Sequence, residues 1–367
     1  MVLEDIALTM TPGIGVKGAA YLLEAFGDAR AIFAASAEEL AAKTRLRPDP
    51  LQAIVRKKAF PAAEKELAYC RRHGIDAVAS TDPRYPVLLR EIPDLPHVLY
   101  FKGEIEPLSG PCLSVVGTRD ATPYGQQMCN RLIEGLAERI PRLTIISGLA
   151  FGIDIAAHHA ALAAGLRTVA VVANPLPAVT PAQHTAVARE ILDRGGTLVT
   201  ELHSQSKQNG TFYLARNRII AGLSAGCLVV ESHNTGGSLY TAHCADSYNR
   251  TVMAVPGRAT DRASAGTNHL IRNKKANLVM TADDIVDALM WDLGEDPATL
   301  RPKPQEPLLT SSEETRLLAC FETADPMSVE TLAAKSGLDP GELSMRLVEL
   351  ELAGAIRQLP GNRYMKL

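Results

Sequence analysis

The sequence predicts an α/β fold whose central part is a doubly wound, mostly parallel sheet. Between residues 112 and 290, short apolar runs that read as strands alternate with stretches that are mostly long enough for a helix. The runs are LSVVG, LTIIS, RTVAVVA, TLVT, CLVVE, TVMAVP and NLVM. Ligands of such sheets bind at the carboxyl ends of the strands, so a functional site is expected just after these runs.

The composition is that of a globular protein with two or three domains: the chain has 367 residues, of which 46% are hydrophobic and 22% charged. The sequence has no run approaching the ~18 apolar residues of a membrane span, and its start lacks the basic and apolar regions of a signal peptide. Its six cysteines form no CxxC pair, which argues against structural zinc and disulfides and favours a cytoplasmic protein.

Charge is distributed unevenly along the chain. The net charge is -3, yet residues 112 to 290 contain 16 Lys and Arg against 13 Asp and Glu. The central segment is therefore mildly basic, and the negative charge of the whole chain does not exclude a nucleic-acid partner.

Residues 1–75 are expected to form a helical domain, because apolar residues recur at helical spacing in AAYLLEAFG and EKELAYCRRHG. A Gly13-Ile14-Gly15 turn would join two short helices, as in a helix-hairpin-helix that presents backbone N–H groups to a phosphate. A helical bundle that does not touch DNA explains the same turn equally well. Residues 76–111 contain several prolines and read as a connector, in which HVLYFKG forms an edge strand.

A linker and a further domain are expected after the sheet. Residues 294–311 are proline-rich with little periodicity, which is typical of a linker. Residues 312–367 predict a winged helix: EETRLLACFE, SVETLAAKSG and PGELSMRLVELELAG read as helices, with Gly337 in the turn between the second and third. The last residues, AIRQLPGNRYMKL, would form a two-stranded wing.

Three glycine-bearing turns directly follow three of the predicted strands of the domain at 112–293. Each turn brings backbone N–H groups near a helix N-terminus, an arrangement that binds anions. The segment ARNR adds two arginines at the same edge, and its asparagine would cap a helix or hold a loop carbonyl. The residues of these turns and of this segment are Gly117, Thr118 and Arg119; Ser147, Gly148 and Gly152; Gly236, Gly237 and Ser238; and Arg216, Asn217 and Arg218.

The turns match no nucleotide-binding fingerprint, because the P-loop sequence and the GxGxxG spacing are both missing. We therefore expect no nucleotide or metal cofactor. Asp154 reads as a helix N-cap or the partner of an arginine, and His158 and His159 read as packing or surface residues rather than metal ligands. Glu231, at the end of a buried strand, is the best candidate for a catalytic carboxylate, and a salt bridge to an arginine of ARNR is an equal alternative.

Six blocks of the central segment resemble, in order, the signature blocks of the DNA-processing protein A (DprA/Smf) family. They are VVGTRDATPYG, IISGLAFGIDIAAHHAAL, ARNRIIAGLSAGCLVVE, GGSLYTAHCA, AVPG and GTNHLIR. The resemblance implies an extended Rossmann-like fold, an N-terminal SAM-like or helix-hairpin-helix domain and a C-terminal winged helix. It also implies a protein that is not an enzyme: a homodimer that binds single-stranded DNA, protects incoming DNA in natural transformation and loads the RecA recombinase.

In that family the DNA lies in a basic pocket on the strand edge, which the resemblance places at the three glycine turns and the ARNR segment. Lys207 corresponds to the lysine of the binding segment. Tyr213, where the family has Phe, supplies a ring on which a base can stack, and Phe212 is the alternative ring. Lys275 stands where the family has Gly and adds positive charge, whereas Gly236 stands where the family commonly has Ser.

Two other functions fit parts of the sequence. A Rossmann-type nucleotide-processing hydrolase would use Glu231, but the sequence offers no second catalytic carboxylate or nucleophile beside it. A transcription regulator would read DNA with the winged helix, but the helix in ELSMRLVELELAG is acidic, which suits contact with protein better than contact with DNA. The sequence therefore favours a single-stranded DNA-binding recombination mediator.

Overall fold

The computed structural model describes residues 2–207, 209–291, 317–318, 320–321, 327–352, 355–359 and 363–366. The chain is divided into two compact units, Met1–Leu293 and Gly294–Leu367. The predicted linker at 294–311 and most of the first predicted helix of the C-terminal region lie outside the described residues. No helix in the described part of the chain is long and apolar enough to cross a membrane.

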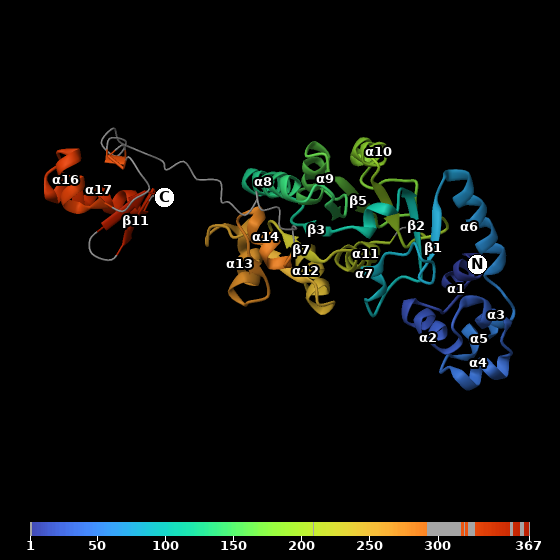
Figure 1. Cartoon of the computed structure of the whole chain (residues 1–367). Coiled ribbons are helices and arrows are strands. Elements are labelled where there is room, and N and C mark those ends of the chain that lie inside the picture. The colour runs from blue at the N-terminus through green and yellow to red at the C-terminus, as the bar shows by residue number, and fades with distance from the viewer. Residues whose placement is uncertain are drawn as a thin grey trace. The chain divides into compact units, whose positions relative to one another are not determined.

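Six helices form the N-terminal part of the first unit, as the apolar spacing predicts (Figure 1). They are α1 (Val2–Met10), α2 (Val16–Phe26), α3 (Ala29–Ala34), α4 (Ala37–Lys43), α5 (Pro48–Val55) and α6 (Phe60–His73). The predicted turn joins α1 to α2, and its Ile14 is buried. Gly13 has a φ of +83°, which side chains rarely adopt, and a Cβ there would collide with Pro50.

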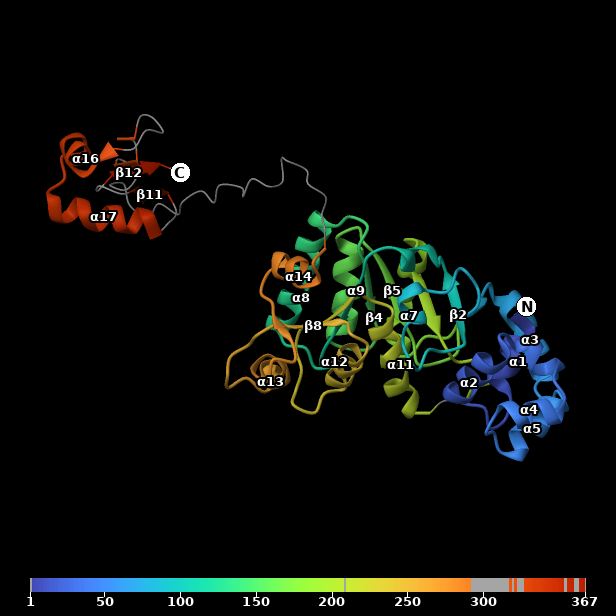
Figure 2. The same ribbon diagram turned by 60° about the horizontal axis from the view of Figure 1, so that its bottom comes forward.

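A nine-stranded sheet is the centre of the first unit, in the order β1-β2-β6-β5-β4-β3-β7-β8-β9. Figure 2 labels β2, β5, β4 and β8 of this sheet. The strands are β1 (Asp76–Ala79), β2 (Val98–Gly103), β3 (Cys112–Val116), β4 (Thr144–Ser147), β5 (Arg167–Val171), β6 (Thr197–Thr200), β7 (Gly226–Val229), β8 (Thr251–Ala254) and β9 (Asn277–Leu278). In the spatial order of the sheet, the seven strands from β6 across to β9 run parallel to one another. The strand β2 is antiparallel to both of its neighbours, β6 and β1. The expectation that HVLYFKG forms an edge strand is wrong, because the short run DAVA pairs on its outer side as β1.

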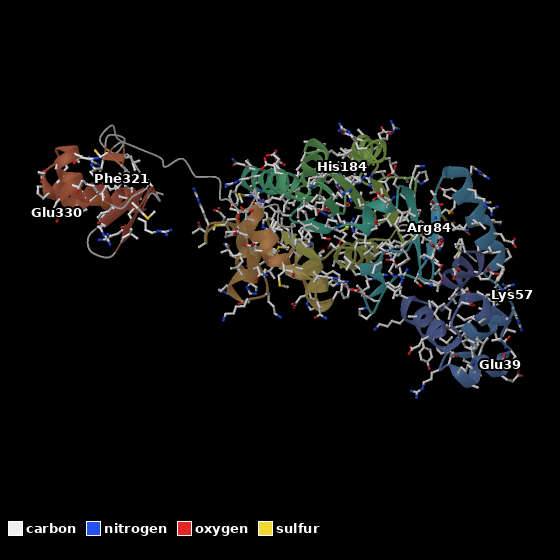
Figure 3. All side chains as sticks on the ribbon, in the orientation of Figure 1. Glu39, Lys57, Arg84, His184, Phe321 and Glu330 are labelled. Atoms are coloured by element: carbon white, nitrogen blue, oxygen red, sulfur yellow. The ribbon has the colours of Figure 1, made fainter. Side chains whose placement is uncertain are left out.

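Helices cover both faces of the sheet, and side chains fill the space between the layers (Figure 3). These helices are α7 (Val87–Arg90), α8 (Pro123–Arg139), α9 (Ile153–Ala163), α10 (Thr185–Asp193), α11 (Thr211–Gly222), α12 (Gly237–Ser247), α13 (Ala265–Arg272) and α14 (Ala282–Leu289). In β3, Leu113 and Val115 pack toward α8 and α9, whereas Cys112 and Val116 pack toward α11 and α12. Every residue of β3 is buried, which is why this strand reads as a continuous apolar run.

The order of the chain across the sheet reverses between β3 and β7. From β3 the chain proceeds through β4 and β5 to β6 on one side, and it then returns to form β7, β8 and β9 on the other side. Leu113 of β3 is paired in parallel with Ile145 of β4 and with Gly226 of β7. The connections therefore diverge at the carboxyl ends of β3 and β7, where a doubly wound sheet opens a crevice. The predicted α/β class is confirmed.

The N-terminal helices pack against the sheet. One hydrophobic cluster contains Ile6 of α1 together with Leu149 after β4 and Val172 after β5. His97, directly before β2, has its Nε2 2.9 Å from Oδ1 of Asp5 in α1, and both side chains are buried. A shared core and a buried polar contact therefore connect the helices of residues 1–75 to the sheet.

The second unit contains a helix-turn-helix and a small sheet, as predicted for a winged helix. Its described elements are β10 (Met327–Ser328), α16 (Val329–Ser336), α17 (Pro340–Leu352), β11 (Ile356–Leu359) and β12 (Arg363–Lys366). Gly337, with a φ of +68°, ends α16. The strand β12 pairs with β11 and with β10, so the two strands of the predicted wing belong to a three-stranded sheet.

Candidate nucleic-acid interface

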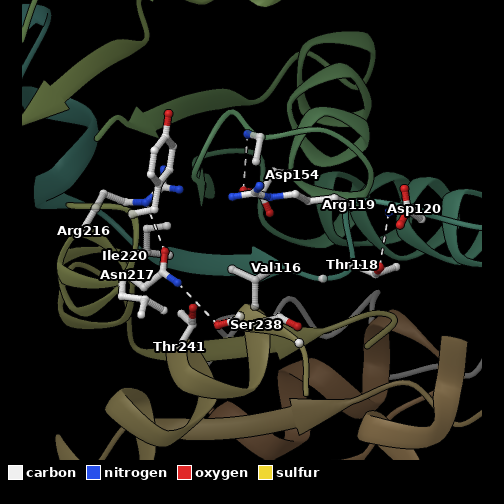
Figure 4. A pocket seen from close by; sticks show the side chains of 16 residues that line it. Val116, Thr118, Arg119, Asp120, Asp154, Arg216, Asn217, Ile220, Ser238 and Thr241 are labelled. Atoms are coloured by element: carbon white, nitrogen blue, oxygen red, sulfur yellow. Dashed lines mark hydrogen bonds between the residues drawn. The ribbon is translucent and has the colours of Figure 1, made fainter. Parts of the chain in front are cut away.

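A pocket of about 270 Å³ opens at the carboxyl ends of β3 and β7, where the order of the sheet reverses (Figure 4). The turns after β3, β4 and β7, one face of α11 and the start of α12 form its walls. The residues that line it are Val116, Gly117, Thr118, Arg119, Asp120, Ala150, Asp154, Tyr213, Leu214, Arg216, Asn217, Ile220, Gly236, Gly237, Ser238 and Thr241. The pocket thus lies on the edge of the sheet that carries the three glycine turns.

The turn after β3 is fixed by main-chain hydrogen bonds to both neighbouring segments. The N–H of Thr118 donates to the carbonyl of Glu231 after β7 at 2.7 Å, and the N–H of Ile153 in α9 donates to the carbonyl of Thr118 at 3.1 Å. Arg119 follows and is exposed, and its guanidinium lies 5.7 Å from the centre of the Tyr213 ring. A cation and an aromatic ring from distant segments therefore lie together in the wall of the pocket.

The turn after β4 supports the pocket from behind. The hydroxyl of Ser147 donates to the carbonyl of Val115 at 2.6 Å inside the sheet. Gly152 has a φ of +76°, and a Cβ there would collide with carbonyl oxygens of the turn after β3. Ser147 and Gly152 therefore shape this edge without facing the pocket, and Ala150 is the residue of the turn that lines it.

The turn after β7 presents the start of α12 to the pocket. The hydroxyl of Ser238 donates to Oγ of Ser232 at 2.8 Å, and Nδ2 of Asn217 in α11 donates to the carbonyl of Gly237 at 3.4 Å (Figure 4). Asn217 therefore holds the carbonyl of the first residue of α12 rather than a loop carbonyl, and it lies within α11 rather than capping it. The positive end of the α12 dipole at this position favours an anion in the pocket.

Arg216 is buried at the back of the pocket, with 5% of its surface exposed. Its Nη1 donates to the carbonyl of Gly148 at 2.5 Å and to the carbonyl of Val171 in β5, so it ties two strand ends together. Burial raises the pKa of the neighbouring Asp154, and the positive charge of Arg216 opposes that shift. An arginine is thus the electrostatic partner of Asp154, as one of the two expectations had it, whereas the N-cap of α9 is Gly152.

Arg218 points away from the pocket, because residues two apart on a helix lie about 200° apart around its axis. Its Nη2 donates to Oε2 of Glu201 at 2.6 Å, and its Nε lies 3.8 Å from Oδ2 of Asp94. The Arg218 side chain is 8% exposed. This guanidinium is therefore engaged in a buried ion pair on the other side of α11 and does not join the expected cationic pocket.

Glu231 anchors the start of α8. Its side chain is 1% exposed, its Oε1 accepts from the hydroxyl of Thr122 at 2.6 Å, and its Oε2 accepts from the N–H of Thr122 at 2.9 Å. Thr122 is the N-cap of α8. Both expectations for Glu231 are wrong: its carboxylate neither pairs with an arginine of ARNR nor lines the pocket as a catalytic group would. The hydrolase alternative thereby loses its candidate residue.

The two predicted lysines are not brought together. Lys207 is exposed in the loop between β6 and α11, on the same edge of the sheet as the pocket but outside its lining. Lys275 lies between α13 and β9, and thus at the amino ends of the strands on the opposite edge, with its Nζ 3.3 Å from Oδ2 of Asp246. Phe212 faces a separate groove against α2, which leaves Tyr213 as the ring in the pocket.

Helical spacing explains which residues the pocket gathers. The predicted residues that line it are Gly117, Thr118, Arg119, Tyr213, Arg216, Asn217, Gly236, Gly237 and Ser238, whereas Ser147, Gly148, Gly152, Lys207, Arg218 and Lys275 do not. The lining also contains Ile220 and Thr241, which lie in the blocks ARNRIIAGLSAGCLVVE and GGSLYTAHCA but are not among the predicted binding residues. Ile220 follows Tyr213 by seven positions, and Thr241 follows Ser238 by three, so both lie on a helix face that a predicted residue already marks.

Among the described residues, no three His, Cys, Asp or Glu side chains form a group that could hold a metal ion. His158, expected to be a packing residue, is fully buried in α9, and its Nδ1 lies 2.8 Å from Oγ1 of Thr168. The Thr168 hydroxyl donates its hydrogen to the carbonyl of Ile145, so Nδ1 of His158 must carry the hydrogen of this contact. His159, one residue on, is exposed.

Two family models match the chain. The model of the DNA recombination-mediator protein A matches residues 76–290, and the model of the DprA winged helix domain matches residues 301–362. The first match begins at β1, so it includes both strands that precede β3.

Known relatives and solved structures point the same way. Protein Smf of Escherichia coli K12 is 35% identical over 316 residues, 84% of this chain and 82% of that protein, and DprA of Bacillus subtilis is 35% identical over 231 residues, 63% of this chain and 76% of that protein. The X-ray structure of DNA processing protein A from Streptococcus pneumoniae has a TM-score of 0.69 and 29% identity, covering 78% of this chain and 97% of that one. For DNA processing protein A from Helicobacter pylori the TM-score is 0.53 at 26% identity, with coverage of 59% and 96%. The chain therefore belongs to the DNA recombination-mediator protein A family, the family of the DprA and Smf proteins.

Proposed function

We propose that the protein binds single-stranded DNA in the pocket at the carboxyl ends of β3 and β7 and acts as a recombination mediator. Two findings support this proposal. The chain belongs to the DNA recombination-mediator protein A family, and the Helicobacter pylori member has a described single-stranded DNA binding mode. The pocket also lies at the position where doubly wound sheets bind their ligands.

The observation that carries the proposal is the pairing of Arg119 with Tyr213. Proteins hold single strands with cations that contact phosphates and with aromatic rings on which bases stack. The exposed Arg119 guanidinium and the Tyr213 ring lie 5.7 Å apart, and both line the pocket. A nucleotide in the pocket would place its base against Tyr213 and its phosphate near Arg119 and the start of α12.

The charges in the pocket determine how much of the affinity for DNA comes from electrostatic attraction and how much from stacking. Arg216 and Asp154 compensate each other at the back, and Asp120 is exposed near Arg119. The pocket is therefore less basic than the motifs suggest, and stacking must contribute a large part of the affinity. Duplex DNA keeps its bases stacked inside the helix, where Tyr213 cannot reach their faces, so we expect a strong preference for single strands.

The finer parts of the proposal rest on the family resemblance. We infer that the protein acts in the cytoplasm as a homodimer, protects incoming DNA during natural transformation and loads the RecA recombinase onto it, without a nucleotide or metal cofactor of its own. Loading is tested by RecA-driven strand exchange on single strands covered with a single-strand-binding protein, which should accelerate when this protein is added. Sedimentation of the full chain should give the mass of a dimer.

Binding is tested by fluorescence anisotropy with one labelled oligonucleotide, free or annealed to its complement, and with mononucleotides as competitors. The wild type should prefer the free strand strongly. Tyr213→Ala should weaken binding by about 1–3 kcal/mol, whereas Tyr213→Phe, which keeps the ring, should bind as the wild type does. Equal affinity for duplex, or an unchanged affinity in Tyr213→Ala, would remove the proposal, and turnover of a nucleotide would favour a hydrolase instead.

A further inference from the structure

Phe151 is a large aromatic side chain exposed on the same edge of the sheet as the pocket. It belongs to the turn between β4 and α9, and 45% of its surface is accessible. Ala150, its neighbour in the chain, lines the pocket together with Tyr213. The Phe151 ring therefore stands beside the pocket without being part of its lining.

The turn that carries Phe151 is held rigidly. In the residue before Phe151, the N–H of Ala150 donates to Oδ2 of Asp154 at 3.4 Å. In the residue after Phe151, Gly152 packs so closely against the turn after β3 that no Cβ fits. An exposed apolar ring on a fixed turn costs little conformational entropy when it binds a ligand, because the main chain is already ordered.

The Phe151 ring packs against His184, the residue directly before α10, which is labelled in Figure 3. The two ring centres lie 4.7 Å apart with an angle of 67° between the planes, which is an edge-to-face contact. His184 is itself buried, and its Nδ1 donates to the carbonyl of Leu149 at 2.8 Å. The Phe151 ring is thus placed by a buried neighbour that has its own fixed position.

We propose that Phe151 is a second stacking platform for single-stranded DNA, on which a base stacks that lies outside the pocket of Tyr213. This inference rests on the proposed function and extends it: the strand would run from Tyr213 past Arg119 to Phe151 along the carboxyl edge. The ring carries no polar group that reads the edge of a base. Phe151 therefore adds affinity for any unpaired base and no sequence preference.

The surroundings of Phe151 favour a base over a protein partner. A stable protein interface needs a contiguous apolar area. Of the large apolar side chains exposed on the described part of the chain, Leu214 is the one that lines the neighbouring pocket. A lone ring next to a pocket that contains arginines, aspartates and a helix N-terminus suits a base of a charged strand better than an apolar protein surface.

The test compares Phe151→Ala with the wild type on unlabelled oligonucleotides of increasing length that compete with a labelled strand. The shortest strands that bind occupy the Tyr213 pocket alone and should bind both proteins equally. Longer strands should lose roughly 5- to 100-fold in affinity, and Phe151→Tyr, which keeps a ring, should retain it. Tyr21→Ala is the matched control, because Tyr21 in α2 has a similar exposure of 42% and lies outside the pocket.

A spectroscopic readout separates direct stacking from an indirect effect. In strands that carry one 2-aminopurine, stacking on a ring quenches its fluorescence. Phe151→Ala should restore the fluorescence at one position of the strand, and Tyr213→Ala at a different one. If both variants affect the same position, or if neither length nor position distinguishes Phe151→Ala from the wild type, the inference is overturned.

Failure of this inference is distinguishable from failure of the proposed function. A wild type that binds no single strand removes the function itself. A wild type that binds, with Phe151→Ala identical at every length, removes only the second platform. Normal DNA binding by Phe151→Ala combined with lost RecA loading would make the ring a protein contact and would also overturn the inference. Should Phe151→Ala melt early, Phe151→Leu keeps an apolar contact with His184 and answers the same question.

Discussion

Arg218 and Glu201 form a buried ion pair on the side of α11 that faces away from the pocket. Their Nη2 and Oε2 atoms are 2.6 Å apart, and the two side chains are 8% and 17% exposed. Burial raises the pKa of Glu201, and the charge and hydrogen bond of Arg218 act against that shift. The net contribution of such a buried ion pair to the free energy of unfolding is small. Removing one partner lowers that free energy by more than this contribution, because the remaining charge stays in the interior.

Arg218→Ala should therefore lower the free energy of unfolding by about 3 kcal/mol, the lower end for a buried pair, since Glu201 keeps some contact with water. Urea denaturation measures this loss. Replacing Glu201 by Gln in the same protein should restore most of the stability. Arg194→Ala is the control: Arg194 is exposed, its contact with Glu190 is 3.4 Å long, and its loss should change stability by less than about 1 kcal/mol. A loss for Arg218→Ala as small as that of the control would contradict the assignment.

The positions of Arg216 and Arg218 show which features of the site could be predicted from the sequence and which could not. Their place before an apolar run indicates that they lie next to the core, and the structure agrees. The sequence does not show that α11 begins at Thr211, five residues before Arg216. Once that start is known, the two-residue spacing sends Arg216 and Arg218 to opposite sides of the helix. Local spacing therefore predicts the divergence of the side chains, and only the tertiary structure supplies the partners, Glu201 and the carbonyl of Gly148.

The strands of the sheet, too, could be predicted from the sequence only in part. Six of the seven parallel strands could be predicted because they are largely buried apolar runs, whereas both residues of the seventh, β9, are exposed. The run DAVA is too short and too rich in alanine to be recognised, and it forms a strand because β2 offers an unpaired edge. The family pattern predicts Lys275 at the pocket. Its position on the opposite edge follows from its place directly before the strand NLVM, because a residue that precedes a parallel strand lies at the amino ends of the strands.

Stability should fall as the pH is lowered below the ordinary pKa of histidine, because folding lowers the pKa of His158. Burial, followed by the neighbouring positive charges, lowers the pKa of His158 from 6.5 to about 3. Its Nδ1 already donates to Thr168, and within the described residues Nε2 is buried without a hydrogen-bond partner. Between these two pKa values the unfolded chain binds a proton that the folded chain does not.

This contribution is complete above about pH 6.5 and is lost as the pH falls toward about 3, by up to about 1.4 kcal/mol per pH unit. Denaturation in urea at neutral and at mildly acidic pH measures the slope. His158→Leu removes the titrating group and should show a shallower decline than the wild type. His269→Gln, at an exposed position in α13, should decline as the wild type does. Equal slopes in all three proteins would show that other groups determine the acid sensitivity.

The C-terminal unit should be dispensable for binding single strands. Its helix α17 carries three glutamates against one arginine, so its charge repels phosphates. Its exposed Met345 and Val348, 54% and 52% accessible, suit contact with protein rather than with DNA. A chain that lacks residues 300–367 should keep its single-strand affinity within a few-fold in the anisotropy assay. A loss of about tenfold or more would assign the winged helix a direct role in binding.

Arg119 and Arg216 should separate binding from stability. Arg119 is exposed beside Tyr213, so Arg119→Ala should leave the unfolding free energy unchanged while it weakens binding. Each phosphate contact that is lost should also reduce the slope of log affinity against log salt by about 0.7 for a single strand. Arg216→Ala should instead lower stability by about 3–5 kcal/mol, because Asp154 loses its opposite charge and the carbonyl of Gly148 loses its donor.

The salt dependence decides between these roles, because a structural arginine does not release counterions when DNA binds. Affinity is measured at several salt concentrations, at a temperature at which both variants are folded, alongside the melting temperature of each. Arg216→Ala should melt early and keep the slope of the wild type. If it keeps its stability and loses slope, Arg216 contacts a phosphate after all, as its place in the ARNR segment suggests. If Arg119→Ala melts early with an unchanged slope, the phosphates bind elsewhere, and the exposed Lys207 on the same edge of the sheet becomes the next residue to replace.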